Sequence, residues 1–99
     1  MKQLSVTEYI EWIRTNKQHV LIDVREDWER QVFNIGGIHI PLSELQERKD
    51  EIEKVSPIVF YCEKGIRSQI IIQRLEDAGY ENLYNLTGGM KAWRQMDTE

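Results

Sequence analysis

The sequence has only one cysteine, Cys62, among its 99 residues. One cysteine cannot form an intramolecular disulfide, and a free thiol suits a reducing compartment. The two histidines, His19 and His39, stand apart from each other and from Cys62, so no ligand set for a metal ion can be recognised. The chain also lacks a glycine-rich phosphate or dinucleotide fingerprint. We therefore expect neither a metal ion nor an organic cofactor.

Long apolar runs and an excess of positive charge are absent as well. No stretch is long enough to span a bilayer, and Met1–Ser5 lacks the apolar core and cleavage site of a signal peptide. The formal net charge of −4 argues against nucleic acid as a partner, because nucleic-acid-binding domains tend to be basic. We expect a cytoplasmic protein with no membrane or nucleic-acid partner, and its length predicts one domain over residues 1–99.

The most informative stretch is Pro57–Ser68, in which a short apolar run ends at Cys62. The run predicts a strand, the residues around Gly65 predict a tight loop, and the pattern from Gln69 onward predicts a helix. A thiol in this position faces free backbone N–H groups of the loop and the first helical turn, and these favour negative charge. Arg67 adds a permanent positive charge. The thiolate form and a nucleophilic role are therefore favoured.

The alternative for Cys62 is a small, inert, buried apolar side chain at a strand end, which is common for free cysteines. Such a residue needs neither a glycine three positions later nor an arginine two positions after that. The composition of the loop therefore favours a functional thiol.

Strands and helices are predicted to alternate along the chain. Ser5 and Glu8 fit a capping box before a helix, and Val20–Ile22 is a continuous apolar run typical of a buried parallel strand. The other predicted strands are Ile38–Ile40, Ile58–Tyr61 and Leu83–Leu86, and the predicted helices cover residues 5–14, 26–31, 42–55, 69–78 and 90–94. Core positions are expected at Ile52, Val55, Ile70, Ile71, Leu75 and Ala78, with Ile72 at the margin and a frayed polar tail over residues 95–99. This alternation predicts an α/β fold: a small, doubly wound, mostly parallel sheet of four to five strands with helices on both faces.

Asp23 and Arg25 stand at the carboxyl end of the strand that contains Val20–Ile22. In open α/β sheets, ligands bind at this end of the strands. The alternatives are surface charges or a structural ion pair, and the residues alone leave these open. His39 is a candidate acid–base group, but a structural role is the better prediction because no second histidine, cysteine or carboxylate stands at ligand spacing.

Four segments of the chain together resemble rhodanese domains. They are Leu21–Glu26, Gly36–Leu42, Cys62–Ser68 and Gly88–Trp93, and they follow the family's order and approximate spacing. The resemblance implies a rhodanese-like fold and a sulfurtransferase. In such an enzyme Cys62 attacks the outer sulfur of a small anionic donor, thiosulfate or a persulfide, and carries it as a persulfide. A thiol or cyanide then accepts the sulfur.

The same resemblance implies roles for the other site residues. The loop residues Glu63, Lys64, Gly65, Ile66, Arg67 and Ser68 would bind substrate, with their N–H groups around the thiolate and the persulfide. Arg67 would hold the shape of the loop or attract an anionic donor, and Gly65 would permit the turn. Asp23 and Arg25 would support the loop by hydrogen bonding rather than take part in the chemistry.

Two segments depart from the common family pattern. Relatives that use thiosulfate often carry a basic residue after the cysteine, whereas this chain has Glu63, which should make a doubly charged donor less welcome; Lys64 offers compensation. Val32–His39 replaces a more common run of glycine, histidine, isoleucine, proline, glycine and alanine. This variant is similar to rhodanese segments that are fused to, or work with, enzymes that activate sulfur-carrier proteins, which favours a protein as sulfur donor or acceptor.

Two other functions are compatible with the same fold. A phosphatase or arsenate reductase typically has one more residue between the cysteine and the arginine, and the six residues Cys62–Arg67 make the shorter loop. A non-catalytic binding or sensing module usually lacks the cysteine, which this chain retains. A chain of 99 residues has no second lobe, so we expect Cys62 to be open to solvent and able to meet a protein partner directly. The oligomeric state is not predicted; Trp12, Trp28 and Trp93 are candidates for core or interface.

Overall fold

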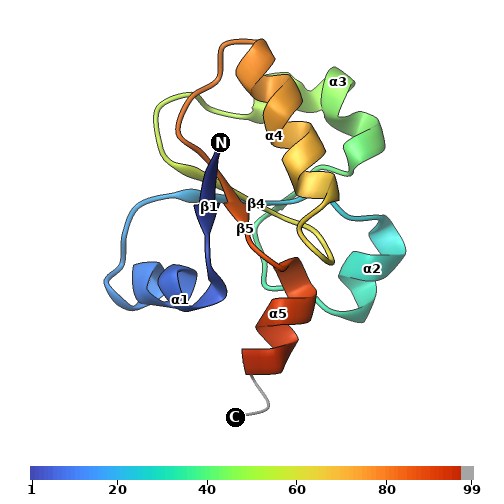
Figure 1. Cartoon of the computed structure of the whole chain (residues 1–99). Coiled ribbons are helices and arrows are strands. Elements are labelled where there is room, and N and C mark those ends of the chain that lie inside the picture. The colour runs from blue at the N-terminus through green and yellow to red at the C-terminus, as the bar shows by residue number, and fades with distance from the viewer. Residues whose placement is uncertain (97–99) are drawn as a thin grey trace.

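Five parallel strands form one sheet in the computed structural model, which describes residues 1–96 (Figure 1). The strands are β1 (Lys2–Leu4), β2 (Val20–Asp23), β3 (Ile38–His39), β4 (Ile58–Tyr61) and β5 (Leu83–Leu86). Their order is β1-β5-β4-β2-β3, and every neighbouring pair is parallel. The predicted α/β fold is therefore confirmed. Residues 97–99, part of the tail expected to fray, lie outside the described residues.

Helices cover both faces of this sheet. They are α1 (Val6–Arg14), α2 (Asp27–Val32), α3 (Leu45–Arg48), α4 (Arg67–Asp77) and α5 (Gly89–Met96), with short 3-10 helices η1 (Leu42–Glu44) and η2 (Lys49–Glu51) on either side of α3. Figure 1 shows α3 and α4 on one face, α1 and α5 on the other, and α2 beside the start of α4. The capping box before α1 is confirmed, since Ser5 and Glu8 each accept the other's backbone N–H. Within residues 1–96, no helix is long and apolar enough to cross a membrane.

The central strand β4 contributes to two separate cores because its side chains alternate between the faces of the sheet. Phe60 packs in the core beneath α4, whereas Val59 and Tyr61 pack in the core beneath α1 and α5. All four residues of β4 are buried, as expected for a strand covered on both sides. Cys62 follows directly and is therefore held by a strand that is buried along its whole length.

The core face of α4 differs in part from the expected one. Ile71 and Leu75 are buried as predicted, but Ile72 is fully buried rather than marginal, and Ile70 is 41% exposed. Ala78 is also exposed, because it lies just beyond the last turn of α4. The helix directs the side of Ile71, Ile72 and Leu75 toward the sheet, which rotates the apolar face by about one position from the predicted one.

Two further segments differ from the expected structure. The helix predicted over residues 42–55 ends with η2 at Glu51, so Val55 lies in the turn before β4 and is 84% exposed. Strand β1 was not predicted, because it has only three residues and pairs with β5 alone at the edge of the sheet. Trp12 and Trp93 pack against the core beneath α1 and α5, whereas Trp28 is 66% exposed.

Candidate active site

Cys62 lies at the carboxyl end of the central strand, and the loop after it ends where α4 begins at Arg67. The Gly65 and Ser68 N–H groups both donate to Cys62 Sγ, with nitrogen–sulfur distances of 3.1 Å and 3.4 Å. Gly65 has φ of +87°, and a Cβ there would lie 3.0 Å from the Gly88 nitrogen, so the turn requires glycine. The loop thus directs two backbone donors at one sulfur atom, an arrangement that stabilises a thiolate.

The prediction that Cys62 is open to solvent was wrong, because the residue is only 1% exposed. The loop and the first turn of α4 fold around Sγ, so that N–H groups occupy positions that water would otherwise take. Cys62 nevertheless lines a hollow of about 300 Å³, here called the thiol pocket. The other residues that line it are Glu29, Glu63, Lys64, Ile66 and Arg67. A sulfur atom that reacts with Cys62 must therefore be carried into this pocket by a narrow chemical group, because Cys62 does not lie on an open surface.

A buried polar chain runs from the thiol to the edge of the sheet. Ser68 Oγ lies 3.4 Å from Cys62 Sγ and donates a short hydrogen bond to Asn85 Oδ1. Asn85 Nδ2 donates to Gln3 Oε1 at 3.0 Å and to the Gly65 carbonyl at 3.3 Å. Because the Ser68 hydroxyl proton points to Asn85, Ser68 Oγ is placed to accept a hydrogen bond from a protonated thiol. Asn85 thereby ties the loop to β5 and β1.

Asn85 was missed by the sequence prediction, which treated residues 83–86 only as a strand. Its amide is fully buried, and so is the Ser68 hydroxyl. A buried polar side chain has to find hydrogen-bond partners. An asparagine inside a short, otherwise buried strand was therefore the available signal, but its partners could be found only from the fold.

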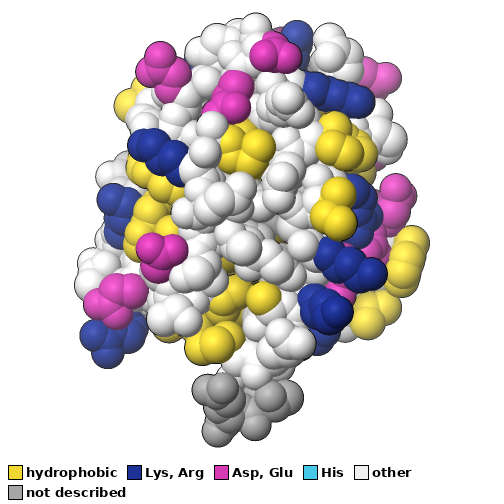
Figure 2. Space-filling view, viewed as in Figure 1, with side chains coloured by type: hydrophobic (Ala, Val, Ile, Leu, Met, Phe, Trp, Pro, Cys, Tyr) yellow, Lys and Arg dark blue, Asp and Glu magenta, His cyan; other side chains and the backbone are white. Residues whose placement is uncertain are grey.

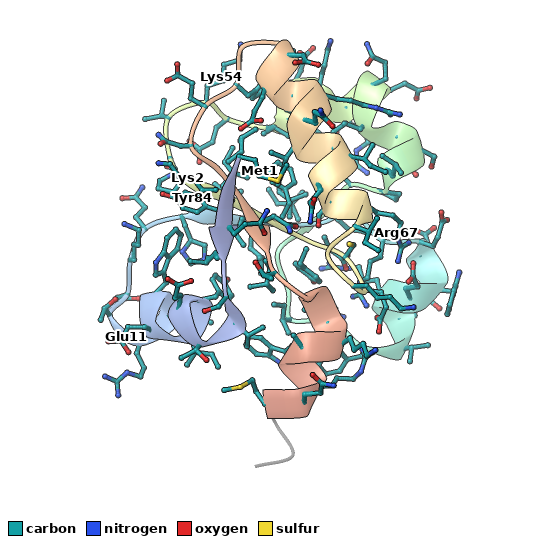
Figure 3. The ribbon with its side chains drawn as sticks, in the orientation of Figure 1. Met1, Lys2, Glu11, Lys54, Arg67 and Tyr84 are labelled. Atoms are coloured by element: carbon teal, nitrogen blue, oxygen red, sulfur yellow. The ribbon has the colours of Figure 1, made fainter. Side chains whose placement is uncertain are left out.

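Arg67 forms a bidentate ion pair with Glu29, a residue that the sequence prediction did not single out. Arg67 Nη1 and Nη2 lie 2.6 Å and 2.7 Å from the two carboxylate oxygens. Hydrogen bonding between the two side chains lowers the pKa of Glu29 and raises the pKa of Arg67. Figure 3 shows Arg67 at the start of α4, extended toward α2. The Arg67 charge is thus shared with a carboxylate and does not face the thiol pocket alone.

Replacing Glu29 by glutamine is expected to lower the free energy of unfolding by about 1 kcal/mol at pH 7, since a partly exposed bidentate pair is lost. The loss should be full above the unfolded pKa of glutamate, about 4.3. It should shrink as the pH falls through the lower pKa of folded Glu29, where the carboxylate of the natural protein becomes protonated. Urea unfolding across this range tests the prediction. The control is Glu81→Gln at an exposed position. If the free energy of unfolding of Glu29→Gln differed from that of the natural protein by the same amount at every pH, the prediction would be contradicted.

Asp23 and Arg25 form a buried ion pair, so the alternative of surface charges is wrong. Their exposed fractions are 0% and 1%, and Arg25 donates from Nε and Nη2 to the two Asp23 oxygens at 2.9 Å and 3.0 Å. Arg25 also donates to the Phe33 carbonyl, and Arg30 adds a second cation to Asp23 at 3.2 Å. The pair comes near the cysteine loop at Arg25 Nη1, which lies 4.0 Å from Glu63 Oε1. Support of the loop by this pair stays a prediction.

Glu63 and the start of α5 hold the first half of the loop. Glu63 forms an ion pair with Arg94 of α5, so its negative charge is partly neutralised. The Met90 and Lys91 N–H groups donate to the carbonyls of Cys62 and Glu63, both at 2.9 Å. Lys64 and Ile66 are exposed at the thiol pocket. The α5 backbone therefore fixes the position of the cysteine.

His39 lies at the edge of the sheet rather than in the thiol pocket. Its Nε2 lies 2.7 Å from the Arg25 carbonyl, and its Nδ1 lies 3.5 Å from Asp27 Oδ1. These contacts fit the predicted structural role. Within residues 1–96, no three side chains of His, Cys, Asp or Glu are grouped as ligands for a metal ion.

Comparison with known proteins identifies the family. A family model described as "Rhodanese-like domain" matches residues 5–96. The chain belongs to the rhodanese-like domain family. The resemblance drawn from the four sequence segments is thereby confirmed.

Individual relatives of this rhodanese-like domain are similar in sequence and in structure. A thiosulfate sulfurtransferase, GlpE, from Coxiella burnetii is 32% identical over 94% of this chain and 87% of its own length. YqhL of Bacillus subtilis, described as uncharacterized, is 45% identical over 74% of this chain, a match that covers 59% of that protein. The crystal structure of a rhodanese-like domain protein from Staphylococcus aureus superposes with a TM-score of 0.86 at 26% identity, covering 94% of this chain and 91% of the other.

Proposed function

We propose that this rhodanese-like domain is a sulfurtransferase that carries sulfane sulfur as a persulfide on Cys62. The observation that carries the proposal is the sulfur itself, which accepts two backbone N–H donors and lines a pocket of about 300 Å³. Such donors stabilise an anionic sulfur before and after transfer. The similarity to a thiosulfate sulfurtransferase over 94% of the chain supports the same reaction class.

The first half-reaction loads the enzyme. With thiosulfate, the Cys62 thiolate attacks the outer sulfur, the sulfur–sulfur bond breaks, and its electron pair leaves with sulfite. Cys62 then carries the persulfide anion. With an organic hydropersulfide R–S–SH, attack on the outer sulfur releases the thiolate R–S⁻ and leaves Cys62–S–SH. This is covalent catalysis in two steps.

The second half-reaction unloads the enzyme. Cyanide attacks the outer sulfur of the Cys62 persulfide and leaves as thiocyanate, which restores the Cys62 thiolate. A thiolate acceptor does the same and becomes a persulfide. The Gly65 and Ser68 N–H groups are placed to hold the sulfur of Cys62 throughout, and Ser68 Oγ is placed to accept a hydrogen bond from the resting thiol.

The proposal extends to the donor, the acceptor and the cellular setting of the reaction. Glu63, Lys64, Ile66 and Arg67 line the thiol pocket and would contact the donor, an anionic sulfur compound; a thiol or a sulfur-carrier protein would be the acceptor. The reaction needs a free thiol, which supports a reducing, cytoplasmic setting. The family match over residues 5–96 supports a single domain.

Intact-protein mass spectrometry after brief exposure to thiosulfate, with and without later cyanide, tests the proposal. We expect a gain of one sulfur atom that cyanide removes, and no gain in Cys62→Ser. A gain from an organic persulfide but not from thiosulfate would support the function and restrict the donor. No gain from either donor would overturn the proposed function and favour a non-catalytic binding module.

A further inference from the structure

A second hollow of about 330 Å³ adjoins the thiol pocket. The two hollows share Glu29 and Glu63 as walls, so they form neighbouring compartments at one end of the sheet. The full lining of the second hollow is Arg25, Trp28, Glu29, Val32, Phe33, Glu63 and Arg94. The sulfur chemistry described above uses the thiol pocket alone, and it gives this second hollow no role.

The second hollow exposes large apolar side chains to solvent. Trp28 is 66% exposed and Val32 is 78% exposed, and their spacing of four residues places both on one side of α2. Phe33 continues this lining. Figure 2 shows hydrophobic side chains at the edge of the molecule over α2, next to basic and acidic ones. A concave, mainly apolar site with a few polar groups is the usual form of a small-molecule site.

The charges around the second hollow are largely paired. Glu29 binds Arg67, Glu63 binds Arg94, and Arg25 binds Asp23. Two carboxylates therefore stand between the hollows, each neutralised by an arginine. Because these charges are already paired, they would attract an additional negatively charged group on the ligand only weakly. The apolar walls, in contrast, can bury an uncharged hydrocarbon group.

We propose that the second hollow binds the uncharged apolar group R of an organic hydropersulfide R–S–SH, and of the thiol R–SH that it becomes. This inference rests on the proposed function and names the substrate class of the same site. The sulfur end reaches Cys62 in the thiol pocket, while an aliphatic or aromatic R lies against Trp28, Val32 and Phe33. In the forward direction Cys62 S⁻ attacks the outer sulfur and the electron pair of the broken bond leaves on R–S⁻. In reverse, R–S⁻ takes the outer sulfur from Cys62.

Thiosulfate gains nothing from this site. Its sulfonate end carries charge and has no hydrocarbon part, so it occupies the thiol pocket without contact to the apolar walls. Cyanide likewise lacks an R group. The second hollow should therefore make the enzyme discriminate between organic and inorganic acceptors. The quantity to measure is the ratio of the rate constants for sulfur transfer to the two kinds of acceptor.

The kinetic test uses two matched valines. Val32 lines the second hollow and Val55 lies far along the chain in the turn before β4; both are largely exposed. The Cys62 persulfide is reacted with 3-phenylpropane-1-thiol and, separately, with cyanide. In Val32→Ser the thiol-to-cyanide ratio of second-order rate constants should fall about fivefold, because apolar contact with the phenyl group is lost. Val55→Ser should keep the natural ratio, and equal ratios in all three proteins would overturn the inference.

A binding experiment separates this inference from the proposed function. Phenylpropanol, which has no sulfur, is titrated into Cys62→Ser while the Trp28 indole N–H is followed by NMR. Saturable changes in the chemical shift of the Trp28 indole N–H, with weaker binding when Val32→Ser is combined with Cys62→Ser, would support the apolar site. This holds even if Cys62 never accepted sulfur in the mass spectrometry experiment. Absence of saturable shifts would overturn the site, even if Cys62 formed a persulfide from thiosulfate.

Discussion

Replacing Gly89 by alanine is expected to reduce sulfur transfer by about a hundredfold, the size of effect that a misplacement of about 1 Å produces at a reacting centre. Gly89 begins α5 with φ of +55°. A Cβ there would lie 2.2 Å from the Cys62 carbonyl oxygen and 2.9 Å from the Glu63 carbonyl carbon. Both are backbone atoms of the cysteine loop, so they cannot move aside as a flexible side chain would. Either the loop or α5 must shift, and Cys62 moves with them.

The matched control for this prediction is Gly79→Ala. Gly79 also has a positive φ, +94°, but a Cβ there meets nothing within 4 Å. Gly79→Ala should lower the free energy of unfolding by about 1 kcal/mol through backbone strain. The rate at which this variant forms thiocyanate from thiosulfate and cyanide should stay near that of the natural protein. The rates are compared well below both melting temperatures. Similar rates for the two variants would show that close contact at Gly89 does not position the cysteine.

Replacing Arg25 by methionine is expected to lower the free energy of unfolding by about 3–5 kcal/mol, the usual effect of breaking a buried ion pair. The change leaves the Asp23 carboxylate, which is 0% exposed, with Arg30 as its remaining cation and removes the donor to the Phe33 carbonyl. Urea unfolding at pH 7 measures the loss. Arg14→Met is the control, because Arg14 pairs with Glu11 while 74% exposed, and its loss should be about 0.5 kcal/mol or less.

A double variant tests the reason for this loss. In Asp23→Leu/Arg25→Met both charges are absent, so no buried carboxylate is left that has lost its main partner, Arg25. The double variant should be more stable than Arg25→Met alone, although Phe33 still lacks its donor. If the double variant were less stable than Arg25→Met, the loss of stability in the single variant would come from packing or from the Phe33 contact. It would not come from the Asp23 carboxylate that has lost Arg25.

Local sequence patterns predicted the fold and the position of the thiol well. The run Ile58–Tyr61 has the composition of a buried strand, and a glycine three residues after Cys62 allows the turn that brings two N–H groups to the sulfur. These features depend on backbone geometry over only a few residues. For that reason the strand, the loop and the presence of a helix after it could be predicted without knowledge of the rest of the chain, although α4 begins at Arg67 rather than at the predicted Gln69.

Side-chain pairing across the site could not be predicted in this way. Arg67 was expected to hold the loop or attract a donor, but its partner Glu29 lies 38 positions earlier in the sequence. Asn85 lies 17 positions after Ser68, and Arg94 lies 31 positions after Glu63. Nothing in the local composition of either partner indicates the other. These contacts depend on how α2, β5 and α5 meet at one end of the sheet.

The burial of Cys62 shows the same division most clearly. The sequence by itself determined a parallel α/β sheet, a rhodanese-like cysteine loop and a thiol facing backbone donors, because each arises from local periodicity, turn chemistry or a short motif. Only the tertiary structure decided that the thiol is enclosed, that each acidic residue of its pocket is neutralised by an arginine, and that an apolar hollow adjoins it. The exposure of the thiol and the balance of charge around it depend on neighbours that come from distant segments. The order of residues along the chain does not reveal which segments those are.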